Sequence, residues 1–415
     1  MQSSETSHTR VGIEKIWAYP CTLSVDLLEV AAVRGRPPAE VRDDLLVLTR
    51  SINPLWEDPV TMAINAAMPM VTEEDKKDIE LVIVGTESSV DQSKAMSTYA
   101  HKFLGLGDNC RNYEAKHACY SGTVAVMMAA HWVASGVAPG KKALVICTDQ
   151  SRESLNEHYE YVMGAGAVAM IISDNPRVLR LADLRQHGYF TCDALDTFRP
   201  TSRVETGNNE ISLYSYLDAL ESAYQHYRSK APDLDFDEYF QWHIYHVPFG
   251  GMAFQAHRTA LRFSKRMKKS EAMAHFERKV KPSLLYNMYL GGTYGGSTFL
   301  ALMGLVDSGD VQPGDRVSMF SYGSGSGGEF YPAVIGPDAK ELIGAVGLKA
   351  QIDSRRTLTL DEYEELERER QRLIDEGDWR PDTTHLGDLY PERYDGKGLL
   401  VLKGIADHFR DYGWS

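Results

Sequence analysis

Three short, continuous apolar runs constrain the fold of this chain more than any other feature. They cover residues 81–84, 143–147 and 166–173, and each is bounded by glycine or polar residues. An apolar run without alternating polar positions is typical of a strand that is covered on both faces. Helical patterns separate the runs, and alternation of strands with helices predicts layered α/β architecture.

The same alternation continues along the rest of the chain. It predicts a helix over 211–227, a strand ending at His246 and another strand over 316–322. Near the N-terminus, the pattern predicts a helix over 24–33. The Glu/Arg-rich segment 357–372 predicts a charged helix, for which a solvated surface position is the default.

Cys119 indicates the chemistry most directly. It lies directly before Tyr120-Ser121-Gly122-Thr123 and the Ala-rich apolar run 124–134, which predicts a buried helix. In the turn that opens a helix, unpaired N–H groups and the positive dipole end favour a thiolate, the nucleophilic form. A lone cysteine is more often a small buried thiol, so two further segments are needed to decide whether Cys119 is a nucleophile.

The first of these segments contains Glu87, which follows the apolar run 81–84 and a Gly-Thr turn. A carboxylate at the end of a strand is a common position for a general base. The ordinary alternative is an acidic residue in the first turn of a helix, where the dipole favours it.

The second segment contains His246, which ends an aromatic and β-branched stretch just before Pro248. A histidine that faces a cleft can polarise a carbonyl or transfer a proton, and a satisfied core histidine is the ordinary alternative. His243 lies three residues earlier and should face the other side of an extended strand. Only one of the two is therefore expected in any single pocket.

In this order and at these separations, the three segments resemble the 3-hydroxy-3-methylglutaryl (HMG) synthase family of the thiolase superfamily. Residues 86–94 are similar to its glutamate motif, 118–123 to its nucleophile motif and 246–248 to its histidine motif. Segments 164–170 and 320–326 are also similar to family segments. Five matches in one order argue against a chance resemblance.

This resemblance implies a thiolase-like fold, with two α/β halves stacked as α/β/α/β/α layers. We expect the boundary near Asn175-Pro176, so that residues 1–175 hold Glu87 and Cys119 and residues 176–415 hold His246. The superfamily also implies a homodimer.

The resemblance further implies an acyltransferase that forms a carbon–carbon bond. Cys119 would hold an acetyl group as a thioester, and Glu87 would remove a proton from its methyl group. His246 would donate to the carbonyl of the acceptor. Backbone N–H groups at Cys119 and in the turn that contains Ser324 and Gly325 would stabilise the enolate, and hydrolysis would then free a carboxylate.

Three departures from the family pattern affect the acceptor pocket. Family members of primary metabolism have lysine-rich sequence after the His-Val-Pro segment, whereas residues 249–255 contain no lysine, which weakens the case for a coenzyme A diphosphate. Gly292 stands where an active-site asparagine is expected, and Glu153 stands where a tyrosine is usual. Asp149 matches a family aspartate that would support the site, with a plain turn or N-cap residue as the alternative.

A group of cations that we call the basic island follows the changed segment. Its residues are Arg258, Arg262, Lys265, Arg266, Lys268 and Lys269, with no acidic residue among them. A solvated helix face is the ordinary interpretation. In a chain of formal net charge −14, the island also fits a docking surface for an acidic acyl carrier protein. A carrier delivers its acyl group on a phosphopantetheine arm, so no bound cofactor is expected.

Composition excludes several other classes of protein. The negative net charge argues against nucleic-acid binding as the main role. The five cysteines form no C-x-x-C pair and no metal-ligand spacing with histidine, so we expect no metal and a reducing cytoplasm. A signal peptide and a bilayer-spanning apolar stretch are not evident.

Three functions therefore compete. The first is the polyketide branch of the family, which adds an acetyl-derived carboxymethyl group to the β-ketone of a carrier-bound chain, with separate donor and acceptor carrier proteins. The second is a primary HMG-CoA synthase acting on acetyl-CoA and acetoacetyl-CoA. The third is a non-catalytic thiolase-fold protein that only binds carrier domains. Comparing acetyl donors discriminates among them.

Overall fold

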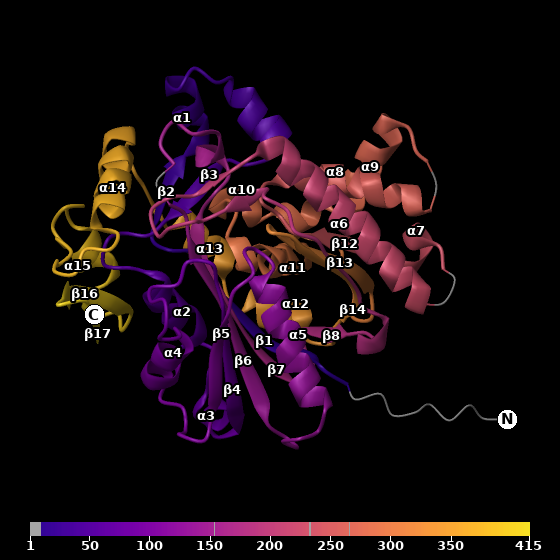
Figure 1. The fold of residues 1–415 in the computed structure, drawn as a ribbon, viewed down its shortest axis with the longest axis horizontal. Helices are drawn as coiled ribbons and strands as arrows, with labels where there is room; N and C mark the ends of the chain where they lie inside the picture. Colours follow the sequence, from indigo (N-terminus) through magenta and orange to yellow (C-terminus); the bar gives the residue numbers. More distant parts are fainter. Residues whose placement is uncertain (1–9, 153, 232–233, 265) are drawn as a thin grey trace.

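The computed structural model of the protein describes residues 10–152, 154–231, 234–264 and 266–415, so Glu153 and Lys265 lie outside the described residues (Figure 1). The main feature of this part of the chain is a mixed sheet of ten strands in the order β12-β13-β14-β8-β1-β7-β6-β4-β5, with β9 paired to β14. The first half contributes β1 (Gly12–Tyr19), β4 (Ile79–Gly85), β5 (Arg111–Ala115), β6 (Lys142–Gln150) and β7 (Ala165–Ser173). The second half contributes β8 (Leu179–Leu181), β9 (Gly188–Thr191), β12 (Trp242–Tyr245), β13 (Arg316–Gly323) and β14 (Gly327–Ile335).

The three apolar runs form β4, β6 and β7, as predicted, and these strands are neighbours in the sheet. Only two residue pairs, Gly12 with Arg180 and Ile13 with Leu179, join β1 to β8 and so connect the two halves. The expected boundary after residue 175 falls in the connection between β7 and β8, and the division into halves at that point stays a prediction.

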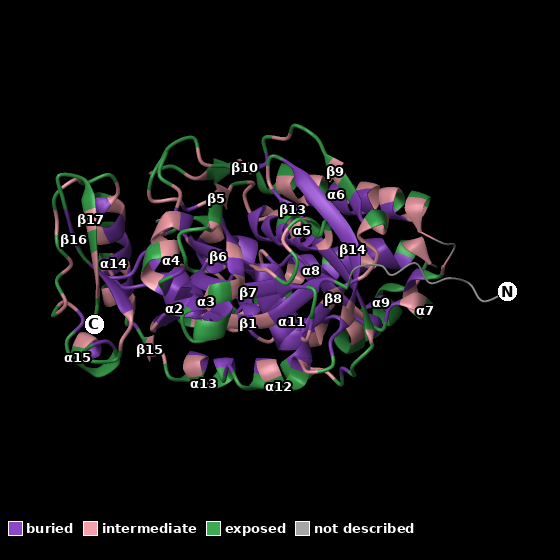
Figure 2. Ribbon diagram, turned by 90° about the horizontal axis from the view of Figure 1, so that it is seen from below, coloured by how far each residue is buried: buried purple, intermediate pink, exposed green. Residues whose placement is uncertain are grey.

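Helices cover both faces of each half-sheet, which confirms the α/β/α/β/α layers. The helices α2 (Pro59–Ala67) and α5 (Ser121–Ala134) pack on β6 and β7, while α6 (Asn209–Lys230) packs on β14 and α11 (Ser297–Ser308) on β12 and β13. Alternate residues of β6 enter different cores, with Val145 in one and Leu144 and Ile146 in the other. Figure 2 shows how buried residues concentrate in these central layers.

A third core joins the two ends of the chain. A small sheet contains β2 (Leu23–Asp26), β3 (Thr49–Ile52) and β15 (Arg356–Thr357), and the C-terminal part adds α14 (Leu360–Leu373), α15 (Leu389–Arg393) and the hairpin of β16 (Leu400–Ala406) and β17 (Phe409–Trp414). Asn65 on α2 exchanges two hydrogen bonds with the backbone of Leu400, at 3.1 and 2.8 Å. The C-terminal segment is therefore fastened to the first half of the chain.

Two predicted elements need correction. The expected helix over 24–33 is a strand followed by a short helix, because residues 23–26 pair with β3 and Asp26 caps α1 (Leu27–Val33). The charged helix α14 is not only a solvated element, since Tyr363 and Leu366 are buried in the third core and Leu373 is also buried. The remaining helices and strands are α3 (Glu73–Asp78), α4 (Ser97–Leu104), β10 (Thr197–Phe198), β11 (Thr206–Gly207), α7 (Phe236–Tyr239), α8 (Gly250–Ala260), α9 (Lys269–Lys279), α10 (Asn287–Leu290), α12 (Ala339–Gly344) and α13 (Leu348–Asp353). Across the described ranges, each helix is too short or too polar to span a membrane.

Candidate active site

Cys119 lies in a tight turn directly before α5. Ala118 has a φ of 41°, in the left-handed region that residues with a side chain rarely adopt, and this turn presents the cysteine. A Cβ on Gly122 would lie 2.2 Å from the carbonyl oxygen of Gly295, and one on Gly85 would lie 2.7 Å from that of Ser121. Glycine at position 85 lets the start of α5 approach the end of β4, where Glu87 follows, and glycine at position 122 lets the same turn of α5 approach Gly295.

Glu87 and Cys119 are in direct contact, since Cys119 Sγ donates to Glu87 Oε2 at 3.5 Å. Asp149, at the end of β6, fixes the glutamate turn. Its Oδ1 accepts hydrogen bonds from the Glu87 backbone N–H and from Thr86 Oγ1, both at 2.9 Å. Asp149 is buried and holds the turn that carries Glu87, and its support of the reaction stays a prediction.

Burial governs the protonation of this pair. It raises the pKa of Glu87 to about 8, with Arg199 opposing that rise and Asp149 adding to it. Burial and the neighbouring carboxylates of Glu87 and Asp149 raise the pKa of Cys119 well above its usual value. The prediction that the helix dipole makes Cys119 a thiolate is therefore wrong for the unloaded protein. Burial and the nearby carboxylates favour the neutral thiol more strongly than the dipole favours the thiolate.

His246 lies just beyond the end of β12 and reaches the same region from the second half. Its ring Nδ1 lies 2.8 Å from Ser297 Oγ, and burial lowers the pKa of His246 to about 3, so the imidazole is neutral. His243 is buried elsewhere, stacked on Phe236 and 2.7 Å from Ser318 Oγ. The expectation that only one of the two histidines faces a pocket is confirmed.

One cavity of about 480 Å³ is lined by Glu87, Cys119 and His246 together. The end of β4, the start of α5 and the end of β12 thus converge, although these residues lie up to 159 positions apart in the sequence. The remaining lining is largely apolar or aromatic, and includes Leu45, Val162, Met163, Leu213, Tyr216, Phe249, Met252, Tyr294 and Tyr322.

The other predicted site residues take different places. Ser324 lines the cavity. The N–H of Gly325 is already bonded to Asp196 Oδ1 at 2.9 Å, which contradicts its expected role as an oxyanion donor. Gly292 takes part in the structure through its backbone, since its N–H donates to the Val162 carbonyl at 2.6 Å. A side chain has no room there, because a Cβ would lie 2.7 Å from the Pro248 carbonyl oxygen.

Two charged residues beside Glu87 were not anticipated from the sequence. Arg199 Nε lies 3.5 Å from Glu87 Oε1, and Arg199 Nη2 lies 2.8 Å from Glu205 Oε2. Both residues belong to an irregular segment around β10 and β11, where no periodicity or motif marks them. Only the fold shows that this segment returns to the active site.

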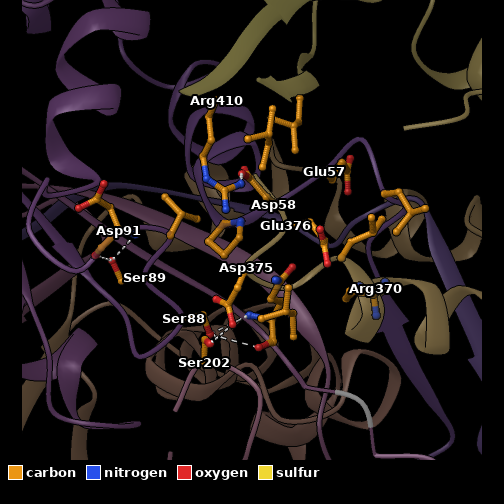
Figure 3. Close-up of a pocket in the computed structure, with 18 of the residues that line it drawn as sticks. Glu57, Asp58, Ser88, Ser89, Asp91, Ser202, Arg370, Asp375, Glu376 and Arg410 are labelled. Atoms are coloured by element: carbon orange, nitrogen blue, oxygen red, sulfur yellow. Dashed lines mark hydrogen bonds and ion pairs between the residues drawn. The ribbon is translucent and has the colours of Figure 1, made fainter. Parts of the chain in front are cut away.

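A second cavity, of about 440 Å³, lies behind the glutamate turn (Figure 3). Ser88, next to Glu87 in the chain, lines it, but Glu87, Cys119 and His246 do not. Much of its charge is internally paired, for example Arg410 with Asp58 at 3.1 Å. This cavity is therefore distinct from the candidate active site.

The basic island begins close to the active-site cavity. Gln255 on α8 lines the cavity, and Arg258, one turn further along, donates to Gln255 Oε1 at 3.4 Å. Beyond it, Arg262, Arg266 and Lys269 line an open surface pocket of about 450 Å³. As for metals, the part of the chain that the structure describes brings together no group of three or more His, Cys, Asp or Glu side chains suited to hold an ion.

Comparison with known proteins gives concordant results along the chain. The family models for the N-terminal and C-terminal parts of hydroxymethylglutaryl-coenzyme A synthase match residues 57–177 and 261–411. The polyketide biosynthesis 3-hydroxy-3-methylglutaryl-ACP synthase PksG of Bacillus subtilis is 38% identical over 366 residues, covering 85% of this chain and 87% of that protein. A hydroxymethylglutaryl-CoA synthase of Enterococcus faecalis is 31% identical over 356 residues, covering 85% and 90%.

Among solved structures, the HMG synthase of the curacin biosynthetic pathway superposes with a TM-score of 0.92. It is 38% identical, and the alignment covers 98% of this chain and 100% of that one. That synthase has also been crystallised in complex with its holo donor-ACP, with the same TM-score and coverage.

Proposed function

This chain belongs to the hydroxymethylglutaryl-coenzyme A synthase family, and from that premise we propose that it is the HMG synthase of a polyketide β-branching system. It takes acetyl from a donor acyl carrier protein onto Cys119 and condenses it with the β-ketone of an acyl chain on an acceptor carrier protein. Hydrolysis then releases a β-hydroxy-β-carboxymethyl acyl product. The convergence of Cys119, Glu87 and His246 on one cavity is the observation that carries the chemistry.

In the first step, the acetyl group moves from the carrier thiol to Cys119. The thiol loses its proton as it attacks the donor thioester, and that proton ends on the sulfur of the departing carrier. The carrier leaves as a free thiol. Because the pKa of Cys119 is raised by burial and by the nearby carboxylates, the nucleophile forms only as this proton is transferred.

In the second step, Glu87 removes a proton from the methyl group of the acetyl thioester, and the resulting enolate attacks the ketone carbon of the acceptor. A neutral imidazole can donate to the ketone oxygen as charge develops there. Ser297 engages Nδ1 of His246, which leaves Nε2 as the ring nitrogen for the substrate. Water then cleaves the Cys119 thioester, giving a carboxylate and restoring the thiol.

Two observations support carrier proteins as the partners. The basic island starts one helical turn from Gln255, at the edge of the active-site cavity, where a carrier that inserts its arm would have to dock. The similar curacin synthase forms crystals with its holo donor-ACP, a carrier that bears the phosphopantetheine arm. The arm would thus arrive with the carrier.

We further propose a homodimer working in the cytoplasm. The strand β5 lies at the end of the ten-stranded sheet and pairs only with β4 among the described strands, and its first three residues are exposed, as suits pairing with a second copy. All five cysteines are free, as expected in a reducing compartment.

The test is the intact mass of the protein after incubation with acetyl-carrier protein and, separately, with acetyl-coenzyme A. Acetylation of Cys119 from the carrier, at least tenfold faster than from coenzyme A, supports the proposal. Equal or faster acetylation from coenzyme A would assign the chain to primary metabolism. No acetylation from either donor would favour a protein that only binds carriers.

A further inference from the structure

Arg199 lies between two carboxylates that face the active site. Its Nε and Nη2 contact Glu205 Oε2 at 2.9 and 2.8 Å, while its Nε lies 3.5 Å from Glu87 Oε1. The guanidinium also donates through Nη1 to the Glu87 carbonyl oxygen at 3.2 Å and to Ser88 Oγ at 3.1 Å. Its carbon Cζ lies 4.9 Å from the ring centre of Tyr294, a residue of the cavity wall. These contacts fix the guanidinium in one place.

The surroundings of the Glu87 carboxyl make this cation important. Burial and two neighbouring acids favour the protonated form, whereas Arg199 favours the carboxylate. The titratable and charged groups that face Glu87 among the described residues are Cys119 from the start of α5, Asp149 from β6, Arg199 and Glu205 from the segment around β10 and β11, Tyr294 of the cavity wall, and neutral His246 across the cavity. Arg199 supplies the positive charge in this set.

We propose that Arg199 is a positioning residue that holds Glu87 as a carboxylate for proton removal, and that Glu205 moderates this effect by sharing the same guanidinium. The proposal rests on the proposed function, in which Glu87 is the base of the condensation step. Glu205 binds the guanidinium more closely than Glu87 does, so Glu87 receives only part of its charge. The arrangement leaves Glu87 ionisable and still basic enough to take a proton from carbon.

The two partners should act in opposite directions on the same titration. Arg199→Gln removes the cation and leaves Glu87 among acidic groups. The acidic limb of the pH–rate profile for condensation should therefore move to a higher pH, by about one unit or more. The rate at pH 7 should then fall about tenfold. Glu205→Gln removes a like charge and frees the guanidinium for Glu87, so the acidic limb should move to a lower pH. Arg199→Lys keeps the charge and should return the limb most of the way to the wild-type position.

The experiment isolates the condensation step. Each variant is first acetylated on Cys119 and freed of donor, and its acetyl-enzyme is then mixed with a β-ketoacyl carrier thioester at pH values from 6 to 9.5. Loss of the acetyl-enzyme is followed by intact mass, corrected for its hydrolysis without acceptor. Arg410→Gln is the matched control, since Arg410 lines the second cavity and is paired with Asp58 at 3.1 Å.

Opposite shifts for Arg199→Gln and Glu205→Gln, with no shift for Arg410→Gln, are the expected result. An unmoved limb in Arg199→Gln, or shifts in the same direction for both variants, would overturn the proposal. If Arg199→Gln does not fold, Arg199→Lys and Glu205→Gln still test the proposal. A Glu205→Gln variant whose acidic limb lies at the wild-type pH would show that Glu205 does not moderate the effect of Arg199. A wild-type protein that never condenses would instead refute the proposed function.

Discussion

Gly292 offers a sharp test of how the two halves are fitted around the acceptor pocket. A Cβ on Gly292 would lie 2.7 Å from the Pro248 carbonyl oxygen and 3.1 Å from that of Val162, where ordinary contact begins at 3.4 Å. Any side chain must therefore push the Pro248 carbonyl away by about 0.7 Å. Pro248 lies two residues after His246, so we expect the displacement to reach the imidazole.

The magnitude follows from that contact. Forcing one extra carbon into a packed site costs about 1–3 kcal/mol. For a chain of 415 residues this corresponds to a fall of only about 1–3 °C in Tm, because the entropy of unfolding is large. A displacement of the reacting groups approaching 1 Å lowers the rate by up to about a hundredfold. Gly292→Ala and Gly292→Asn should therefore slow condensation by about 10- to 100-fold and leave acetylation of Cys119 close to normal.

The assay compares rates of acetyl loading and of condensation, with thermal unfolding measured on the same preparations. Gly344→Ala is the control, since a Cβ at Gly344 meets nothing within 4 Å. The reasoning is refuted if Gly292→Asn, which restores the residue expected from the family, condenses as fast as the wild type. It is equally refuted if loading and condensation fall together.

Three other predictions concern the catalytic pair, its titration and the docking surface. Cys119→Ser should give no stable acetyl thioester. Glu87→Gln should still load acetyl but condense about 10²- to 10⁴-fold more slowly. A Glu87→Gln protein that condenses at the normal rate would show that Glu87 is not the base. Because the ionised form of Glu87 is active and its pKa is about 8, the condensation rate should rise with pH through that value and reach only about a tenth of its plateau at pH 7; a flat profile between pH 6 and 9 would contradict this. Reversing two charges of the basic island, with Arg258→Glu and Arg262→Glu, should slow acetyl transfer from the carrier at least tenfold at low salt and leave transfer from a small acetyl thioester unchanged. Equal losses with both donors would point to a structural role for those arginines.

Much of the fold and the reacting groups could be predicted because they depend on local patterns. The strands β4, β6 and β7 are covered on both faces, so their apolar composition identified them. Glu87, Cys119 and His246 lie at the ends of helices or strands, and the motifs around them occur in the same order as in the family.

What could not be predicted depends on contacts between distant segments. Residues 23–26 form a strand because β3 and β15 lie on either side of them, which no local propensity reveals. Arg199 and Glu205 reach Glu87 through an irregular loop. The protonation of Cys119 was misjudged because the dipole of α5 is a local effect, whereas Asp149 and Glu205 approach from elsewhere in the chain. Gly325 lost its expected role to a bond with Asp196.

The small sheet that holds β2 against β15 also dictates when the protein can finish folding on the ribosome. Leu23 pairs with Ile52 on β3 and with Arg356 on β15, so the second of the two partner strands of β2 is made 333 residues after it. At bacterial and eukaryotic synthesis rates, that delay is roughly 17 to 67 seconds. Throughout that interval, the apolar side chains of the third core, such as Leu23, Val25 and Trp56, lack their C-terminal cover. The nascent chain should therefore need chaperone protection until the segment from Arg356 onward emerges, and truncation before Arg356 should yield aggregates instead of a shortened enzyme.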